Sequence, residues 1–217
     1  PGSDRLVFSM DAGGSVFAQL FLLDPNGSED AIMLTDGESR NGAVNWDREG
    51  ESITYLSTRR NGASNDIWMM QVDNPETAEI VLESPDGTYW YGADFSADGS
   101  KLLVANYVGN ADSRIYLLDL ETTEMRLLAG DPENPSANAP WGFDADGEGF
   151  WFVTDVGGDF RQLAWQSLEP GSEPEIITSE IPWHVEGGAV NEERTRAAFT
   201  VNEDGFSRLY LFDPAGR

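Results

Sequence analysis

A segment of about 45 to 50 residues recurs nearly five times along the chain and constrains its fold more than any other feature. The repeat is clearest from Gly92 to Leu128, which reads as a short strand, a tight turn, a hydrophobic strand, a Gly/Asn loop, a third strand ending in Asp119 and a fourth strand. Alignment of the other copies places two sets of residues in register. The first set consists of the pairs Gly42-Ala43, Gly92-Ala93, Gly142-Phe143 and Gly188-Ala189. The second consists of the strand-ending residues Asp24, Asp73, Asp119 and Asp213. A period of this size predicts a toroid or solenoid of small sheets.

Each copy has the pattern of a four-stranded antiparallel blade in a β-propeller. Runs such as Ile53–Leu56 and Phe150–Val153 are short and rich in β-branched and aromatic residues, which favours strands. Asp-Gly turns follow the first strands, and Asn191–Arg194 takes that place in the last copy without glycine. One blade cannot bury both faces of its sheet, so blades stack around an axis. We therefore predict an all-β single domain over residues 1–217, with units at about 1–40, 41–88, 89–139, 140–184 and 185–217.

The strand count predicts incomplete blades at both ends. About eighteen strands are expected, because the first unit begins at its second strand near Arg5 and the fifth ends after its third strand at Asp213. We expect either a fragment of a larger propeller or a chain that completes itself against a partner. Unpaired blade edges also predict self-association.

The charge of the chain is extreme. Against 39 acidic residues there are 13 basic ones, which gives a formal net charge of −26, and Lys101 is the one lysine. A nucleic-acid partner is excluded by this balance, because binding to phosphates requires a basic patch. Acid-rich, lysine-poor composition favours a salt-adapted source, and an ordinary acidic bacterial protein is the alternative.

The sequence contains no recognisable catalytic motif. It has no Gly-x-Ser-x-Gly elbow and no cysteine, and its one histidine, His184, lies in the loop before an inner strand. Two acidic segments, 144–148 and 24–30, resemble parts of calcium loops but lack the twelve-residue spacing, so they are interpreted as β-turns. We expect no enzyme activity in this chain, no catalytic residue, no metal and no cofactor. No apolar run is long enough to span a bilayer, so no membrane partner is expected.

Aromatic residues at equivalent positions of the units are the main binding candidates. They fall in or beside the segments that lead into inner strands and would lie near one rim of the central channel: Trp46, Tyr89, Trp90, Tyr91, Trp141 and Trp183. His184 adjoins this set. Arg59 and Arg60, in a loop between second and third strands, could pair with a ligand carboxylate. Packing between blades is the alternative role for the aromatic residues, and a local ion pair is the alternative for the arginines.

Three phrases carry a resemblance to a known family: YGADFSADGSKLLV from Tyr91, GAVNWDREGESITYLSTRRNGASNDIWMM from Gly42, and IPWHVEGGAVNEERTRAAFTVNEDGFSRLYLFD from Ile181. Their order along the chain resembles the TolB-like, WD40-like propeller that precedes the catalytic domain in the prolyl oligopeptidase family of serine peptidases, including acylaminoacyl-peptidase-like members. The resemblance covers essentially the whole chain.

The resemblance implies that catalysis and control of substrate access belong to two different domains. In that family an α/β-hydrolase domain carries the catalytic triad, and the propeller restricts access of peptides to it. We therefore expect a noncatalytic propeller that gates or docks peptide for a serine peptidase, with an α/β-hydrolase domain or a protein or peptide as partner. A free-standing TolB-like protein-interaction module is the alternative. The expected location is cytoplasmic, with the periplasm as the alternative.

Overall fold

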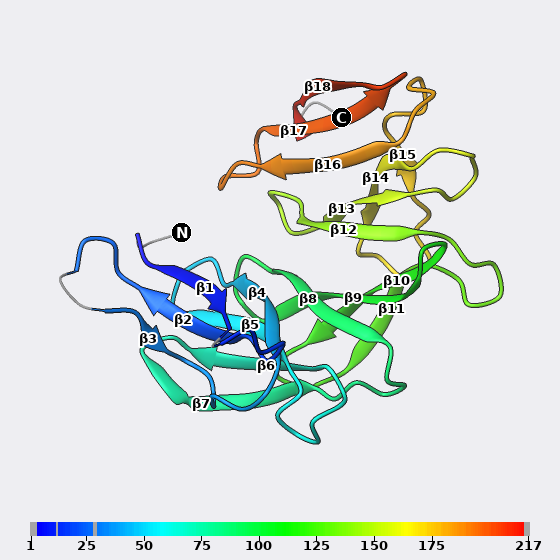
Figure 1. Ribbon diagram of the computed structural model, residues 1–217. Helices are drawn as coiled ribbons and strands as arrows, with labels where there is room; N and C mark the ends of the chain where they lie inside the picture. The colour runs from blue at the N-terminus through cyan, green and yellow to red at the C-terminus, as the bar shows by residue number, and fades with distance from the viewer. Residues whose placement is uncertain (1–3, 12, 28–29, 215–217) are drawn as a thin grey trace. The chain divides into compact units, whose positions relative to one another are not determined.

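The computed structural model describes residues 4–11, 13–27 and 30–214, and these ranges contain strands and turns but no α-helix (Figure 1). Among the described residues, eighteen strands form five sheets, and in each sheet consecutive strands are neighbours. The recorded pairings are antiparallel. The predicted all-β fold built of small blade-like sheets is confirmed.

The strands of the five sheets follow the sequence repeat. The first sheet contains β1 (Leu6–Met10), β2 (Gln19–Leu23) and β3 (Ile32–Met33), and the second contains β4 (Asn41–Trp46), β5 (Ser52–Ser57), β6 (Asp66–Gln71) and β7 (Asn74–Leu82). The third contains β8 (Tyr89–Phe95), β9 (Lys101–Gly109), β10 (Asp112–Asp119) and β11 (Met125–Ala129). The fourth contains β12 (Asn138–Phe143), β13 (Gly149–Thr154), β14 (Gln162–Ser167) and β15 (Glu175–Ile176), and the fifth contains β16 (Val185–Val190), β17 (Ala197–Glu203) and β18 (Phe206–Phe212).

The chain forms two compact units, which are described separately. Unit 1 comprises Pro1–Asn106 and Leu118–Glu124, and unit 2 comprises Tyr107–Leu117 and Met125–Arg217. Unit 1 therefore holds the first two sheets with β8 and part of β9, and unit 2 holds the last two sheets with β11 and most of β10.

Unit 1 has its core between the first and second sheets. Alternate residues of β2, Leu20 and Leu22, pack against β5 and β6 residues such as Ile53 and Met70. β5 is buried along nearly its whole length, which explains why its sequence is a continuous apolar and β-branched run instead of an alternating one. Burial on both faces is what a strand between two packed sheets requires.

Unit 2 repeats this arrangement with the fourth and fifth sheets. Its cluster joins β13, β14, β16 and β17 through the buried residues Trp151, Val153, Leu163, Val185, Phe199 and Val201. Strand β13 is buried at all six positions, so it is also a central strand. Trp151 meets the ring of Phe212 edge-on, with centroids 5.0 Å apart, which extends the cluster to β18.

Turns after the first strands use the predicted residues. Gly50, Gly99 and Gly147 have φ values of 73°, 70° and 73°, in the left-handed region that glycine tolerates. In the fifth sheet Arg194 takes this conformation with φ 58°, so the turn without glycine is confirmed at a cost in backbone strain.

One aligned glycine is needed for packing between sheets. A Cβ atom at Gly188 on β16 would overlap the indole ring of Trp141 on β12 and lie 2.8 Å from the carbonyl oxygen of Ala198. Gly187, directly before it, has open space at the same position. Trp141 therefore packs closely against the backbone of the next sheet at Gly188, with its ring centroid 6.4 Å from that of Phe199.

Candidate binding surfaces

Arg60, in the loop after β5, is held by a local ion pair. Its Nε and Nη2 atoms donate to both carboxylate oxygens of Asp66, at 2.7 and 2.8 Å, and Nη1 lies 3.3 Å from Glu83. Asp66 is fully buried and also accepts a hydrogen bond from the Ser84 amide at 2.9 Å. The hydrogen bonds that Arg60 donates to Asp66 raise the pKa of the guanidinium above its ordinary value. The guanidinium thus stabilises a buried carboxylate inside unit 1.

Arg59 is more exposed than Arg60 and lies over an aromatic ring. Its guanidinium carbon is 5.2 Å from the centroid of the Trp68 ring, and its Nε is 3.8 Å from Asp36. Beside it, burial raises the pKa of Tyr55 to about 12, and the positive charge of Arg59 opposes this shift. Arg59 retains an accessible face in unit 1 that could contact a ligand.

The three consecutive aromatic residues on β8 divide between its two faces. Tyr89 and Tyr91 lie on one face with ring centroids 5.9 Å apart, as the two-residue period of a strand requires. Tyr89 is 42% exposed, and burial raises the pKa of Tyr91. Trp90, on the other face, is 3% exposed and donates through Nε1 to Asp86 at 2.9 Å. Of the three, Tyr89 offers the most surface to a ligand.

Trp46 and Trp141 contribute mainly to packing. Both are partly buried against the core clusters of their own units, Trp46 in unit 1 and Trp141 in unit 2. Trp141 covers Gly188 as described above. These contacts are those of residues that join neighbouring sheets.

Trp183 and His184 lie in a cluster of loops in unit 2. The Arg161 amide donates to Nδ1 of His184 at 2.9 Å, and Nη2 of Arg161 donates to the Asn110 carbonyl oxygen at 3.1 Å. The ring of Phe160 meets that of His184 edge-on at 5.5 Å. Three separate segments are thereby held together, and we call them the loop rim: Tyr107, Val108, Asn110, Phe160, Arg161, Trp183 and His184.

The loop rim exposes apolar and aromatic side chains. Tyr107, Val108 and Trp183 are 45%, 41% and 36% exposed, and His184 is also exposed. Exposed apolar and aromatic residues gathered at the end of β9 and on neighbouring loops are typical of an interaction surface. Of the predicted residues, the structure brings Trp183 and His184 into this rim and places Trp141 in the packing of the same unit, whereas the arginines and the β8 aromatics belong to unit 1.

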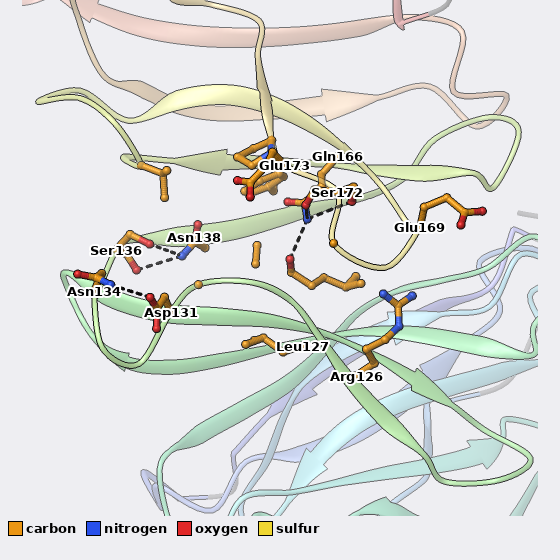
Figure 2. A pocket seen from close by; sticks show the side chains of 17 residues that line it. Arg126, Leu127, Asp131, Asn134, Ser136, Asn138, Gln166, Glu169, Ser172 and Glu173 are labelled. Carbon is orange, nitrogen blue, oxygen red and sulfur yellow. Dashed lines mark hydrogen bonds between the residues drawn. The ribbon is translucent and has the colours of Figure 1, made fainter.

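A pocket of about 440 Å³ in unit 2 was not anticipated from the sequence. Figure 2 shows it between β11 with the loop that follows and the side chains of the fourth sheet. Gln166 and Arg126 are among its lining residues. Asp131, Asn134 and Ser136, in the loop between β11 and β12, also line it.

The calcium-like segments fold as turns. Asp144 accepts hydrogen bonds from the Glu148 amide and the Trp165 indole, both at 3.0 Å. Asp24 accepts from the Asn26 amide at 2.9 Å, and part of that segment, residues 28–29, lies outside the described residues. Within the described ranges no group of three or more His, Asp or Glu side chains is arranged to hold a metal ion. Nor does that part of the chain contain a helix with the length and apolar character needed to span a bilayer.

The five small antiparallel sheets and their packing define a β-propeller-type protein. Residues 1–206 match the family model of the prolyl oligopeptidase N-terminal beta-propeller domain, and the chain belongs to that family. A search of curated proteins found no match.

Solved structures share the fold at low sequence identity. TolB from Acinetobacter baumannii superposes with a TM-score of 0.74 at 18% identity, over 96% of this chain and 50% of that one. Prolyl oligopeptidase B from Galerina marginata, as the apo protein, gives 0.72 at 13% identity, over 97% of this chain and 32% of that one. A prolyl endopeptidase gives 0.58 at 11% identity, over 100% of this chain and 41% of that one. The chain thus spans half or less of the length of these three proteins.

Proposed function

We propose that this propeller domain gates or docks peptide substrate for the α/β-hydrolase domain of a serine peptidase. Membership of the prolyl oligopeptidase N-terminal propeller family supports the pairing with a peptidase domain. A cytoplasmic location belongs to the same proposal.

The loop rim is the observation that carries this function. Arg161 joins the end of β9 and its turn to the loop before β16, and the rim presents Tyr107, Val108 and Trp183 to solvent. Aromatic side chains that combine an apolar ring with a polar group can contact either a peptide or the surface of another domain. Because hydrogen bonds fix the loops, the surface is ordered before any partner binds, which lowers the entropic cost of binding.

The test is peptide hydrolysis by the longer protein that contains this segment. We expect Tyr107→Ser and Trp183→Ser to lower kcat/KM for a ten-residue peptide about fivefold, with little change for a chromogenic dipeptide too short to reach the rim. Met125→Ser, which removes an exposed apolar side chain on β11 outside the rim, serves as the control. Equal activity of all variants on the long peptide, or a reading frame without a serine elbow, contradicts the proposal.

The TolB similarity favours a second candidate, a protein-interaction module without a hydrolase. In that case the same rim binds a folded partner or a partner peptide. This second function predicts that Tyr107→Ser and Trp183→Ser abolish binding of the partner. It also predicts that the protein has no peptidase activity. Sequencing of the gene beyond Arg217 separates the two functions directly, because only the first requires a downstream Gly-x-Ser-x-Gly elbow.

A further inference from the structure

The pocket in unit 2 has the dimensions of a ligand site. Its volume of about 440 Å³ lies within the range of small-molecule and side-chain pockets. One wall is formed by β11 and the loop at residues 130–136, and the other by β13, β14 and the turn at residues 169–174 (Figure 2). The pocket is therefore built between the edge strand of one sheet and the face of the next.

Apolar side chains form part of this pocket. Phe152 on β13 lines it and is almost fully buried, and Leu127 and Val156 remain 42% and 44% exposed. The exposed side chains of Leu127 and Val156 offer apolar surface to a ligand with a hydrocarbon portion.

Gln166 provides a hydrogen-bond acceptor in the same pocket. Its side chain is 5% exposed, and Nε2 donates to the carbonyl oxygens of Leu128 at 2.9 Å and Ser172 at 3.0 Å. Two carbonyl acceptors fix the orientation of the amide, because only the nitrogen can donate to them. In the described part of the chain Oε1 of this pocket-lining residue accepts no hydrogen bond, so it is available to a ligand that can donate one.

The charged side chains around the pocket select the sign of the ligand. Asp131, Glu169 and Glu173 line it against one cation, Arg126, which leaves a formal charge of −2. Arg126 is already engaged, since Nη2 donates to the Leu168 carbonyl oxygen at 2.8 Å. Hydrogen bonds from the Asn134 side chain and the Glu133 amide lower the pKa of Asp131, so its carboxylate remains ionised at neutral pH.

We propose that this pocket binds an arginine side chain of a peptide. The methylene stem packs against Leu127 and Val156, and the guanidinium donates to Gln166 Oε1 and the surrounding carboxylates. An anionic ligand meets three carboxylates, and an apolar one leaves Oε1 unpaired. Arginine combines an apolar stem with five N–H donors. This site is distinct from the loop rim and does not depend on the gating function.

The proposal is tested by titrating the ¹⁵N-labelled chain with acetyl-Ala-Arg-Ala-amide. We expect saturable chemical-shift changes centred on Leu127, Val156 and the Gln166 side-chain amide. The same peptide with norleucine or glutamate in place of arginine should bind at least tenfold more weakly. Shift changes that centre elsewhere, or equal binding of the arginine and norleucine peptides, overturn the assignment.

Matched variants separate a specific site from general attraction to an acidic chain. Glu173→Gln removes an exposed carboxylate that has no partner in the described ranges, and we expect it to weaken the arginine peptide about threefold. Leu127→Ser, which changes no charge, should weaken it by a similar factor. Glu180→Gln removes an exposed carboxylate outside the pocket and should change nothing. Equal effects of Glu173→Gln and Glu180→Gln, or no effect of Leu127→Ser, indicate non-specific electrostatic binding and refute the pocket.

Discussion

Asn138 and Ser113 exchange three hydrogen bonds between β12 and β10. Nδ2 of Asn138 donates to the Ser113 carbonyl oxygen at 2.7 Å, the Asn138 amide donates to Ser113 Oγ at 2.6 Å, and that hydroxyl donates to the Asn138 carbonyl oxygen at 2.7 Å. The same side chain accepts from Thr154 on β13 through Oδ1 at 2.8 Å. Asn41, the first residue of β4, has a comparable role in unit 1, where Nδ2 donates to the Ala18 carbonyl oxygen at 3.1 Å. A buried Asn at the start of an inner strand thus joins that strand to the preceding sheet.

Replacement of this asparagine is expected to be costly. Asn138→Ala leaves the buried Ser113 carbonyl and the Thr154 hydroxyl without their partners and should lower the free energy of unfolding by about 2 to 4 kcal/mol. Urea unfolding followed by far-UV circular dichroism measures this. Asn134→Ala, on the exposed loop, should cost less than about 1 kcal/mol. Equal midpoints for the two variants show that the buried network contributes nothing.

Gly188 and Gly187 form a matched pair for the packing of Trp141. Gly188→Ala places a methyl group against the indole ring and the Ala198 carbonyl and should destabilise the chain by about 1 to 3 kcal/mol. Gly187→Ala has open space and should be close to neutral or slightly stabilising. Thermal unfolding followed by circular dichroism measures the stability of both variants. A Gly187 variant as unstable as the Gly188 variant contradicts this account.

Asp66 should be required for the stability of unit 1. Its carboxylate accepts two hydrogen bonds from Arg60 and one from Ser84, so Asp66→Ala should cost about 3 kcal/mol. Arg59→Ala, which removes a more exposed cation next to it, should cost much less. Denaturant unfolding of both variants distinguishes them, and a larger loss for Arg59→Ala would show that the buried pair is unimportant.

Tyr55 should ionise late in an alkaline titration. Its pKa is raised from 10.0 to about 12 by burial, so between these values the folded chain holds the phenolic proton more tightly than the unfolded chain does. The corresponding stability is complete below pH 10 and is lost as the pH rises through about 12. Absorbance at the phenolate band, compared between the parent chain and Tyr55→Phe, assigns the step. A difference spectrum with a midpoint near 10 would disprove the shift.

Self-association remains a prediction from the sequence, and β18 is where we expect it. Leu209 and Leu211 on this edge strand are 68% and 84% exposed. Leu211→Lys should shift the chain towards a monomer in light scattering, because charge on an edge strand opposes pairing. Val16→Lys, in a loop and 76% exposed, is the control. A parent chain that stays monomeric over the full concentration range refutes the prediction.

The strands and turns can be predicted well from the sequence, because the residues that specify each of them lie within a single repeat. The Asp-Gly turns and the turn at Arg194 follow from adjacent residues, and the buried runs of β5 and β13 follow from continuous apolar composition. The pairing of Arg60 with a buried carboxylate was one of two roles left open for it, since the sequence does not show which carboxylate is buried. Trp90 was selected with Tyr89 and Tyr91, but strand alternation turns it into the interior.

The pocket beside Gln166 could not be predicted from the sequence. Its lining comes from β11, β13, β14 and two loops, and no motif links these segments. Oε1 of Gln166 is available to a ligand because the carbonyl oxygens of Leu128 and Ser172 both accept from the nitrogen of the same amide. This pocket depends on tertiary contacts between different repeats, whereas the repeat pattern shows only the residues that the copies have in common.

The hydrogen bond from Arg161 to His184 gives the molecule a spectroscopic label of its own. Because Nδ1 is an acceptor, the neutral imidazole carries its proton on Nε2. His184 is the one histidine in the chain, so each of its carbon-bound ring protons should give a single resonance in a proton spectrum, without isotope labelling or added tags. Any molecule that binds to the surrounding loops will change the chemical shifts of these resonances, and their linewidths will report the rate at which it exchanges.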